Sequence, residues 1–128
     1  MFEPINKEGK SIFLVNTASI PVPSTTGWAK GAEVTAPYDG LYMVIGYSAI
    51  NVDTISKGYG ICIYRGSTAV SNIVHGTMTG GGGLINILCM NLNAGDKVNI
   101  QMHCTSDSTV SGKSYSSAIY AYRLGPKS

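Results

Sequence analysis

The sequence predicts an all-β protein built as a two-sheet antiparallel sandwich, and three observations carry this prediction. Short apolar runs alternate with clusters of Gly, Pro, Asn, Asp and Ser, which is typical of strands joined by turns. No long segment holds the period of an amphipathic helix. The hydrophobic share is 44%, while only 12% of the residues are charged, against about 25% in an average protein. This composition suits strands with many turns and a surface largely covered by partners.

The chain has 128 residues, the size of one ordinary domain, and can bury a core without disulfide staples. We expect a polar N-terminal arm over residues 1–10 and a single domain over residues 11–128. The polar start shows no secretory signal peptide, and no run of about 18 apolar residues could span a membrane. We therefore expect a protein made in the cytoplasm of its host, without membrane insertion.

Each expected strand is an apolar run bounded by turn-forming residues. The strands lie near residues 11–16, 28–36, 40–50, 58–65, 68–75, 84–92, 96–104 and 116–124.

Turn residues separate the first strands from one another. Two prolines at 21–24 break the connection after the first strand. Pro-Tyr-Asp-Gly at 37–40 makes a turn after the second, because Asp and Gly supply the unusual backbone angles. A polar loop at 51–58 follows the third strand, and Arg-Gly-Ser-Thr at 65–68 forms a hairpin after the fourth.

Glycine-rich and polar segments separate the later strands. Four glycines at 80–83 form a flexible loop, and Asn-Ala-Gly-Asp at 93–96 makes a tight turn. A long polar loop at 105–113 then leads into the closing strand near 116–124.

The strands differ in kind. Apolar and polar residues alternate along 96–104, which predicts one core face and one wet face. The runs at 12–15, 41–45, 87–90 and 118–122 are instead apolar on both faces. A sandwich offers each sheet only one core face, and no helix is available to cover the other.

We therefore predict that these four strands form one sheet, which faces the core on one side and copies of the same chain on the other. The alternative is that some of these residues are simply exposed Tyr and Met side chains. The residues predicted for this inner sheet and its trimer interface are Phe13, Val15, Tyr42, Val44, Leu88, Met90, Tyr120 and Tyr122.

Three motifs resemble those of the complement globular-head family, in the family's order and spacing. Residues 36–42 are similar to its Pro-x-x-Gly-x-Tyr turn, and residues 92–98 to its Leu-x-x-Gly-Asp-x-Val. Residues 117–124 resemble its closing strand, and the resemblance covers roughly 28–124. It implies the jelly roll of about ten strands shared with tumour necrosis factor (TNF), typically a tight homotrimer with both chain ends on one side. The implied interface sheet matches the four two-faced strands.

The sequence departs from the family in its closing strand and in several features that it lacks, and the missing features point to a bacteriophage. Ile119 and Ala121 replace the usual Phe and Gly of the closing strand. No collagen-like stalk, secretory signal or Asn-x-Ser/Thr sequon is present. Compact versions without a stalk are similar to modules of phage tails, baseplates and head fibres. We therefore expect a virion protein that works outside the cell.

No catalytic site is predicted, and we expect a protein that is not an enzyme. The Gly-Lys-Ser tripeptides at 9–11 and 112–114 lack the earlier glycine of a phosphate-binding loop. The two histidines, His75 and His103, have no zinc-site spacing, and nothing marks a catalytic triad. No metal or other cofactor is expected, except that a loop carboxylate could help to hold Ca²⁺.

The three cysteines, Cys62, Cys89 and Cys104, each lie in or at the end of an apolar run. We expect reduced thiols buried in the core, because a free Cys behaves as a small hydrophobe. Reduced thiols fit a protein made in a reducing cytosol.

The candidate receptor-binding residues are aromatic or acidic. Trp28, the only tryptophan, could stack on a sugar ring or close the sandwich edge. Tyr59 and Tyr115 are further candidates, because Tyr is favoured at interfaces. Asp53 and Asp107 lie in polar loops, where they would cap turns or hold the Ca²⁺.

The expected function is a homotrimeric virion module that displays loops for adhesion to a host-surface saccharide. Three copies would give avidity for a repeated sugar. The other expected partners are virion proteins. Nucleic acid is excluded, because the net charge is +2 and no Lys/Arg cluster exists. The alternatives are a purely structural capsid decoration or trimerisation cap, and a complement-like surface ligand that binds a protein receptor.

Overall fold

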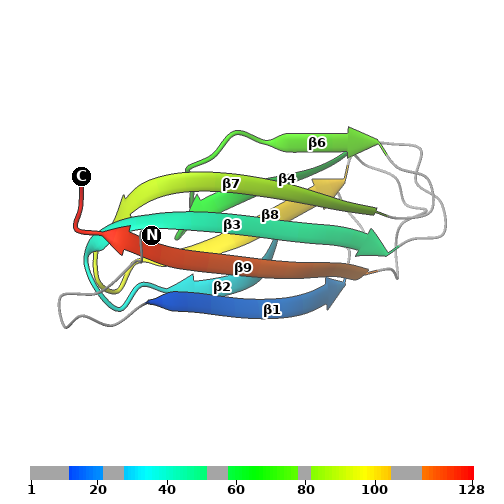
Figure 1. Ribbon diagram of the computed structural model, residues 1–128. Coiled ribbons are helices and arrows are strands. Elements are labelled where there is room, and N and C mark those ends of the chain that lie inside the picture. Colours follow the sequence, from blue (N-terminus) through cyan, green and yellow to red (C-terminus); the bar gives the residue numbers. More distant parts are fainter. Residues whose placement is uncertain (1–11, 22–27, 52–57, 78–81, 105–113) are drawn as a thin grey trace.

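The computed structural model describes residues 12–21, 28–51, 58–77, 82–104 and 114–128, which form two antiparallel sheets packed face to face (Figure 1). These residues contain strands and turns, and none forms a helix that could cross a membrane. The strands are β1 (Phe13–Pro21), β2 (Ala29–Thr35), β3 (Gly40–Asn51), β4 (Gly58–Arg65), β5 (Thr68–Ala69), β6 (Val74–Thr77), β7 (Gly82–Leu92), β8 (Lys97–Cys104) and β9 (Ser114–Gly125).

The first sheet has the order β1-β9-β3-β7, and it forms the front layer in Figure 1. These are the four strands whose sequences are apolar on both faces, so the prediction that they share one sheet is confirmed. β1 continues to Pro21, five residues past its expected end, because it pairs with β9 along its whole length. Its second half carries Asn16, Thr17 and Ser19, which hid this part of the strand in the sequence.

The second sheet has the order β2-β8-β4-β5, with β6 paired to β4. One strand was expected at 68–75, but two short strands lie there instead. Ser71 explains the interruption, because its hydroxyl accepts a hydrogen bond from the backbone N–H of Ile63 at 2.9 Å. A side chain thus replaces the backbone partner that a continuous strand would supply.

The core lies between the sheets and is filled by inward side chains of both. In β8 the alternation is as predicted, since Val98, Ile100 and Met102 are fully buried. Asn99 on the other face is also fully buried, so that position is not wet; its amide donates to the Gly66 carbonyl at 3.0 Å. The buried apolar core comprises Ala32, Val34, Ala36, Tyr42, Val44, Ile61, Ile63, Leu92, Val98, Ile100, Met102, Ile119 and Ala121.

Two turns close one end of the sandwich, and both use the aspartates expected there. Asp96 accepts a hydrogen bond from the backbone N–H of Asn93 at 2.8 Å. Asp39 accepts one from the backbone N–H of Ala94 at 2.8 Å, which ties the two turns together. Gly95 has a positive φ of 91°, a conformation that favours glycine.

The strand ends that adjoin the predicted loops at 51–58 and 105–114 lie at the opposite end of the sandwich. Asn51 of β3 is paired with Ser114 of β9, so the strand ends next to the loops at 51–58 and 105–114 lie side by side. Pro21 is paired with the same serine. The interiors of both loops lie outside the described residues. The C-terminal residues lie at the other end, by the two turns (Figure 1).

Candidate functional site

The outer face of the first sheet is apolar across all four strands. Its exposed fractions are high for large apolar side chains: 60% for Phe13, 53% for Val15, 57% for Ile85 and 60% for Ile87. We call this surface the outer apolar face. It is formed by Phe13 and Val15 of β1, Tyr120 and Tyr122 of β9, Met43, Ile45 and Tyr47 of β3, and Ile85, Ile87 and Cys89 of β7.

The strand register aligns these side chains in rows that cross the sheet. Val15 is opposite Tyr120, which is opposite Ile45, which is opposite Ile87. Phe13 stacks on Tyr120 with ring centres 6.3 Å apart and meets Tyr122 edge-on at 5.5 Å. The surface is therefore continuous, unlike the scattered apolar residues that are normal on a monomer.

The outer face of the second sheet is polar by comparison. The Lys30 ammonium lies 2.7 Å from the Glu33 carboxylate, which also accepts a hydrogen bond from Asn99 at 3.2 Å. Gln101 donates to the Asn99 side chain at 3.0 Å. Polar groups that satisfy one another in this way need no covering partner.

The predicted interface residues divide between the two faces of the first sheet. Phe13, Val15, Tyr120 and Tyr122 lie on the outer apolar face.

The other four predicted residues point inward, toward the core between the sheets. Tyr42 and Val44 are 0% exposed within one chain, and Leu88 and Met90 pack against the core. All four lie in the predicted inner sheet, but Tyr42 and Val44 are closed to a second copy, because an uninterrupted apolar run does not show which face is inside. An interface role for Leu88 and Met90 stays a prediction.

Sequence reasoning missed the outward residues of β3 and β7. In β7 the misleading signal is Asn86, a polar residue on the inward face. Its amide is satisfied there by the Ser71 hydroxyl and the Asn72 carbonyl, both at 2.8 Å. The polar side chain thus conceals that its apolar neighbours Ile85 and Ile87 face outward.

The expectation of buried, reduced thiols holds for one of the two cysteines whose side chains the structure describes. Cys62 is a free thiol that is 1% exposed, and its sulfur lies 3.4 Å from the Ser71 carbonyl. Cys89 is exposed on the outer apolar face, which corrects its expected place in the core. The side chain of Cys104 lies outside the described residues.

Trp28 lies in an aromatic cluster on the second sheet. Its ring centre is 4.3 Å from that of His103 in β8 and 6.0 Å from that of Tyr64 in β4. Both partners alternate with core residues, so the indole covers the outer face of the sheet instead of closing the gap between the sheets. Burial lowers the pKa of His103, and the neighbouring His75 lowers it further.

Of the other receptor-binding candidates, the structure describes only the backbone of the two tyrosines. Tyr59 lies in β4 of the second sheet and Tyr115 in β9 of the first. The side chains of both, and the whole of Asp53 and Asp107, lie outside the described residues.

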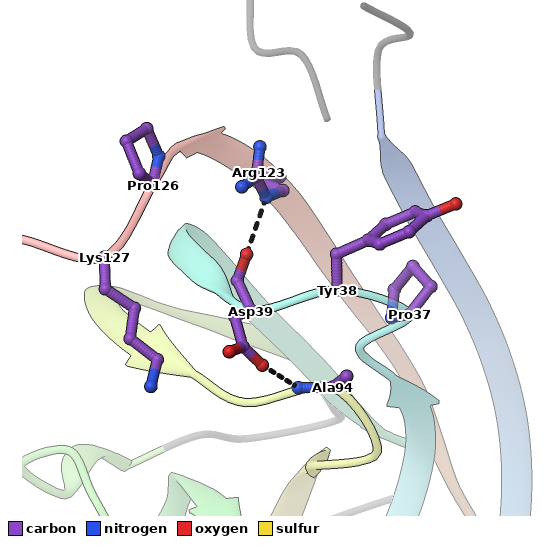
Figure 2. A pocket seen from close by; sticks show the side chains of 7 residues that line it. All are labelled: Pro37, Tyr38, Asp39, Ala94, Arg123, Pro126 and Lys127. Atoms are coloured by element: carbon purple, nitrogen blue, oxygen red, sulfur yellow. Dashed lines mark hydrogen bonds between the residues drawn. The ribbon is translucent and has the colours of Figure 1, made fainter. Parts of the chain in front are cut away.

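A polar hollow lies at the end that carries the two turns (Figure 2). The buried Arg123 donates from Nε to the Asp39 carbonyl at 3.0 Å, which holds the turn at 37–40 against β9. The hollow is lined by Pro37, Tyr38, Asp39, Ala94, Arg123, Pro126 and Lys127. Within the described part of the chain, no three His, Cys, Asp or Glu side chains converge as a metal site.

No family model and no curated protein matches this sequence. Solved structures do match its fold. The PRD1 vertex protein P5 is 16% identical with a TM-score of 0.52, over 87% of this chain and 96% of that one. The globular domain of zebrafish complement 1qA is 12% identical with a TM-score of 0.54, over 97% of this chain and 98% of that one.

A longer viral chain shares the same fold. A chain of infectious bursal disease virus, Gx strain, is 11% identical with a TM-score of 0.53, over 91% of this chain. The present chain covers 34% of that longer one. The strand order and these similarities show that the chain has an antiparallel jelly-roll fold, similar to that of a phage vertex protein and of a complement globular domain.

Proposed function

We propose that this chain is a non-enzymatic, homotrimeric module of a virion surface that binds a saccharide on the host. The observation that carries the proposal is the outer apolar face. A soluble protein rarely exposes so large a continuous apolar surface unless another protein covers it. A second copy is the economical partner, because the same face on each copy supplies the matching apolar surface.

The arrangement of the two ends favours a role in display. If three copies packed through this face with their strands roughly along the threefold axis, their loop ends would point the same way. The polar hollow and the C-terminal residues would then face the opposite side, where other virion proteins would bind. The similarity to a phage vertex protein supports a place on the virion surface.

Trp28 is the residue that we assign to the saccharide. Its indole is partly exposed and is held in place by His103 and Tyr64. An aromatic ring that is already fixed loses little conformational entropy when it stacks on a sugar. Three such sites on one trimer would bind a repeated glycan with avidity, even if each site alone were weak.

The assembly is tested by solution mass from light scattering on a size-exclusion column. We expect about three times the chain mass of 13.5 kDa, unchanged on dilution. Ile87→Glu places a charge on the outer apolar face and should yield a monomer. Ile73→Glu is the matched control, because Ile73 is 45% exposed but lies next to β6 of the second sheet. A monomeric wild-type chain would refute the assembly.

The binding role is tested separately, on trimeric protein, with a glycan array and with intact host cells. We expect reproducible binding that falls roughly tenfold or more in Trp28→Ala, as for a central aromatic contact. Tyr120→Ala, at the outer apolar face, is not used, because it would change the assembly as well. A stable trimer that binds neither a glycan nor the host surface would exclude adhesion. The purely structural role would then be the remaining explanation.

A further inference from the structure

The two histidines of the chain face each other across a glycine on the outer side of the second sheet. Gly60 of β4 is paired with His75 of β6 on one side and with His103 of β8 on the other. Residues that are directly opposite on neighbouring strands project to the same face. Both imidazoles therefore stand on one face, separated by a position that has no side chain.

The space above Gly60 is bounded by both rings. A Cβ atom placed on Gly60 would lie 3.0 Å from Nε2 of His103 and 3.1 Å from Cδ2 of His75. Cγ2 of Ile73 would lie 3.2 Å from the same point and forms a third, apolar wall. The missing side chain thus lets both imidazoles approach the same point above the glycine backbone.

The separation of the rings fits a shared ion. The ring centres of His75 and His103 are 6.1 Å apart, and the ring planes are nearly perpendicular at 85°. Two imidazoles bound to one ion through bonds of about 2.0–2.1 Å place their ring centres roughly 5–6 Å apart. Small side-chain rotations would therefore bring two nitrogen lone pairs onto a common point above Gly60.

His103 lies partly buried in an aromatic environment. The indole of Trp28 covers one side of the His103 ring, with the ring centres 4.3 Å apart. Burial, assisted by the neighbouring histidine, lowers the pKa of His103. A lower pKa favours the neutral imidazole, which has the free lone pair that a metal requires.

We propose that His75 and His103 together bind one divalent transition-metal ion above Gly60, with water molecules as the remaining ligands. The ion belongs to the class that prefers imidazole: Cu²⁺, Ni²⁺ or Zn²⁺. Among these ions Cu²⁺ should bind most tightly, because the affinities of divalent transition metals generally reach their maximum at Cu²⁺. The site lies on the sheet opposite the outer apolar face, so it is independent of the proposed assembly.

Trp28 makes the site directly observable. It is the only tryptophan in the chain, and it contacts one of the two metal-binding rings. We would titrate untagged protein with Cu²⁺ at neutral pH and follow tryptophan fluorescence, which paramagnetic ions quench at short range. We expect saturable quenching with one ion per chain. Ni²⁺ should quench with lower affinity, and Mg²⁺ should leave the fluorescence unchanged.

Three variants assign the ion to the histidines. His75→Gln and His103→Gln should each weaken Cu²⁺ binding tenfold or more, because each removes one of two protein ligands. His75→Gln is the sharper test, because it leaves the contact between Trp28 and His103 in place. Cys89→Ser controls for the exposed thiol on the opposite sheet and should bind Cu²⁺ as the wild type does.

Isothermal titration calorimetry on the same proteins gives the stoichiometry without relying on fluorescence. The proposal is overturned if the wild type binds no ion up to about millimolar Cu²⁺, the weak end of ordinary affinities. It is equally overturned if His75→Gln binds as tightly as the wild type, or if Cys89→Ser alone abolishes binding.

Discussion

At the scale of single residues, Ser117 joins three strands through one hydroxyl. Its Oγ accepts a hydrogen bond from the backbone N–H of Ala32 in β2 at 3.0 Å and donates to the Ala18 carbonyl of β1 at 3.1 Å. The pairing of β2 with β8 shifts register between Lys30 and Glu33. The backbone N–H of Ala32 is therefore hydrogen-bonded to the Ser117 side chain and not to a neighbouring strand. The serine is 4% exposed, which keeps water away from these groups.

We expect Ser117→Ala to lower the free energy of unfolding by about 1–3 kcal/mol, the cost of leaving a buried donor unpaired. Urea unfolding at fixed protein concentration measures this. Ser116→Ala, on the exposed side of the same strand, is the control and should change stability by less than about 0.5 kcal/mol. Equal effects of the two substitutions would show that the Ser117 hydrogen bonds contribute nothing.

Tyr42 gives the molecule a dependence on alkaline pH. Its side chain is 0% exposed, its hydroxyl donates to the Tyr38 carbonyl at 2.8 Å, and burial raises its pKa above the ordinary value. The folded state therefore holds this proton more tightly than the unfolded state does. The resulting stability is fully present below the unfolded pKa of about 10 and is lost as the pH rises through the folded pKa.

We expect Tyr42→Phe to be less stable than the wild type at neutral pH by about 1 kcal/mol, the value of one hydrogen bond. The difference should shrink as the pH rises above about 10, because the wild type then loses stability that the variant lacks. Urea unfolding of both proteins from neutral to alkaline pH measures the difference. A difference that is constant across this range would contradict the assignment to Tyr42.

The direction in which a side chain points could be predicted from the sequence only where the two faces of a strand differ chemically, as in β8, where Val98, Ile100 and Met102 are buried as expected. In β3 and β9 both faces are apolar, so the sequence does not show which of them is inside. The contact of Trp28 with His103 joins residues on different strands, so no local pattern could reveal it.

At the scale of elements, the turn between β7 and β8 relies on one glycine. Gly95 has a φ of 91°, where a Cβ atom would be strained even though the space around it is open. Its N–H donates to the Ala36 carbonyl at 2.7 Å, so the turn also fixes the end of β2.

We expect Gly95→Ala to cost about 1–2 kcal/mol, the penalty of placing a side chain at positive φ. Gly125→Ala is the matched control, because a Cβ atom there also meets open space and the backbone is not in the positive-φ region. Thermal unfolding of the two variants measures the contrast. If both were equally stable, the backbone angle of Gly95 would not be a constraint on the fold.

Strand positions followed from the sequence wherever turn residues mark them. The turn at 93–96 and the alternation in β8 were both predicted, because Gly, Asn and Asp have specific roles in tight turns. The extension of β1 to Pro21 and the split between β5 and β6 were not predicted. The first depends on β9, which is distant in sequence, and the second on a side-chain hydrogen bond between Ser71 and β4, which an apolar pattern does not reveal.

At the scale of the whole molecule, the sequence predicted the sheet membership of four strands better than their individual faces. A strand that is apolar on both sides must lie between two other layers, and this argument needs no knowledge of register. The order β1-β9-β3-β7 agrees with it. The placement of histidines around Gly60 required the order of the other sheet, which no apolar pattern specifies.

The outer apolar face also has a thermodynamic consequence. If copies bind through it, association and folding are linked by mass action, and an isolated chain is the least stable species. The melting temperature should then rise with protein concentration over a roughly hundredfold dilution series, whereas Ile87→Glu should melt at one temperature throughout. Identical melting of the wild type at every concentration would show that folding does not depend on association. Such a chain reaches its full thermal stability only at the high local concentration that exists where many copies are synthesised together. Its stability in the cell would then depend on its concentration as well as on its sequence.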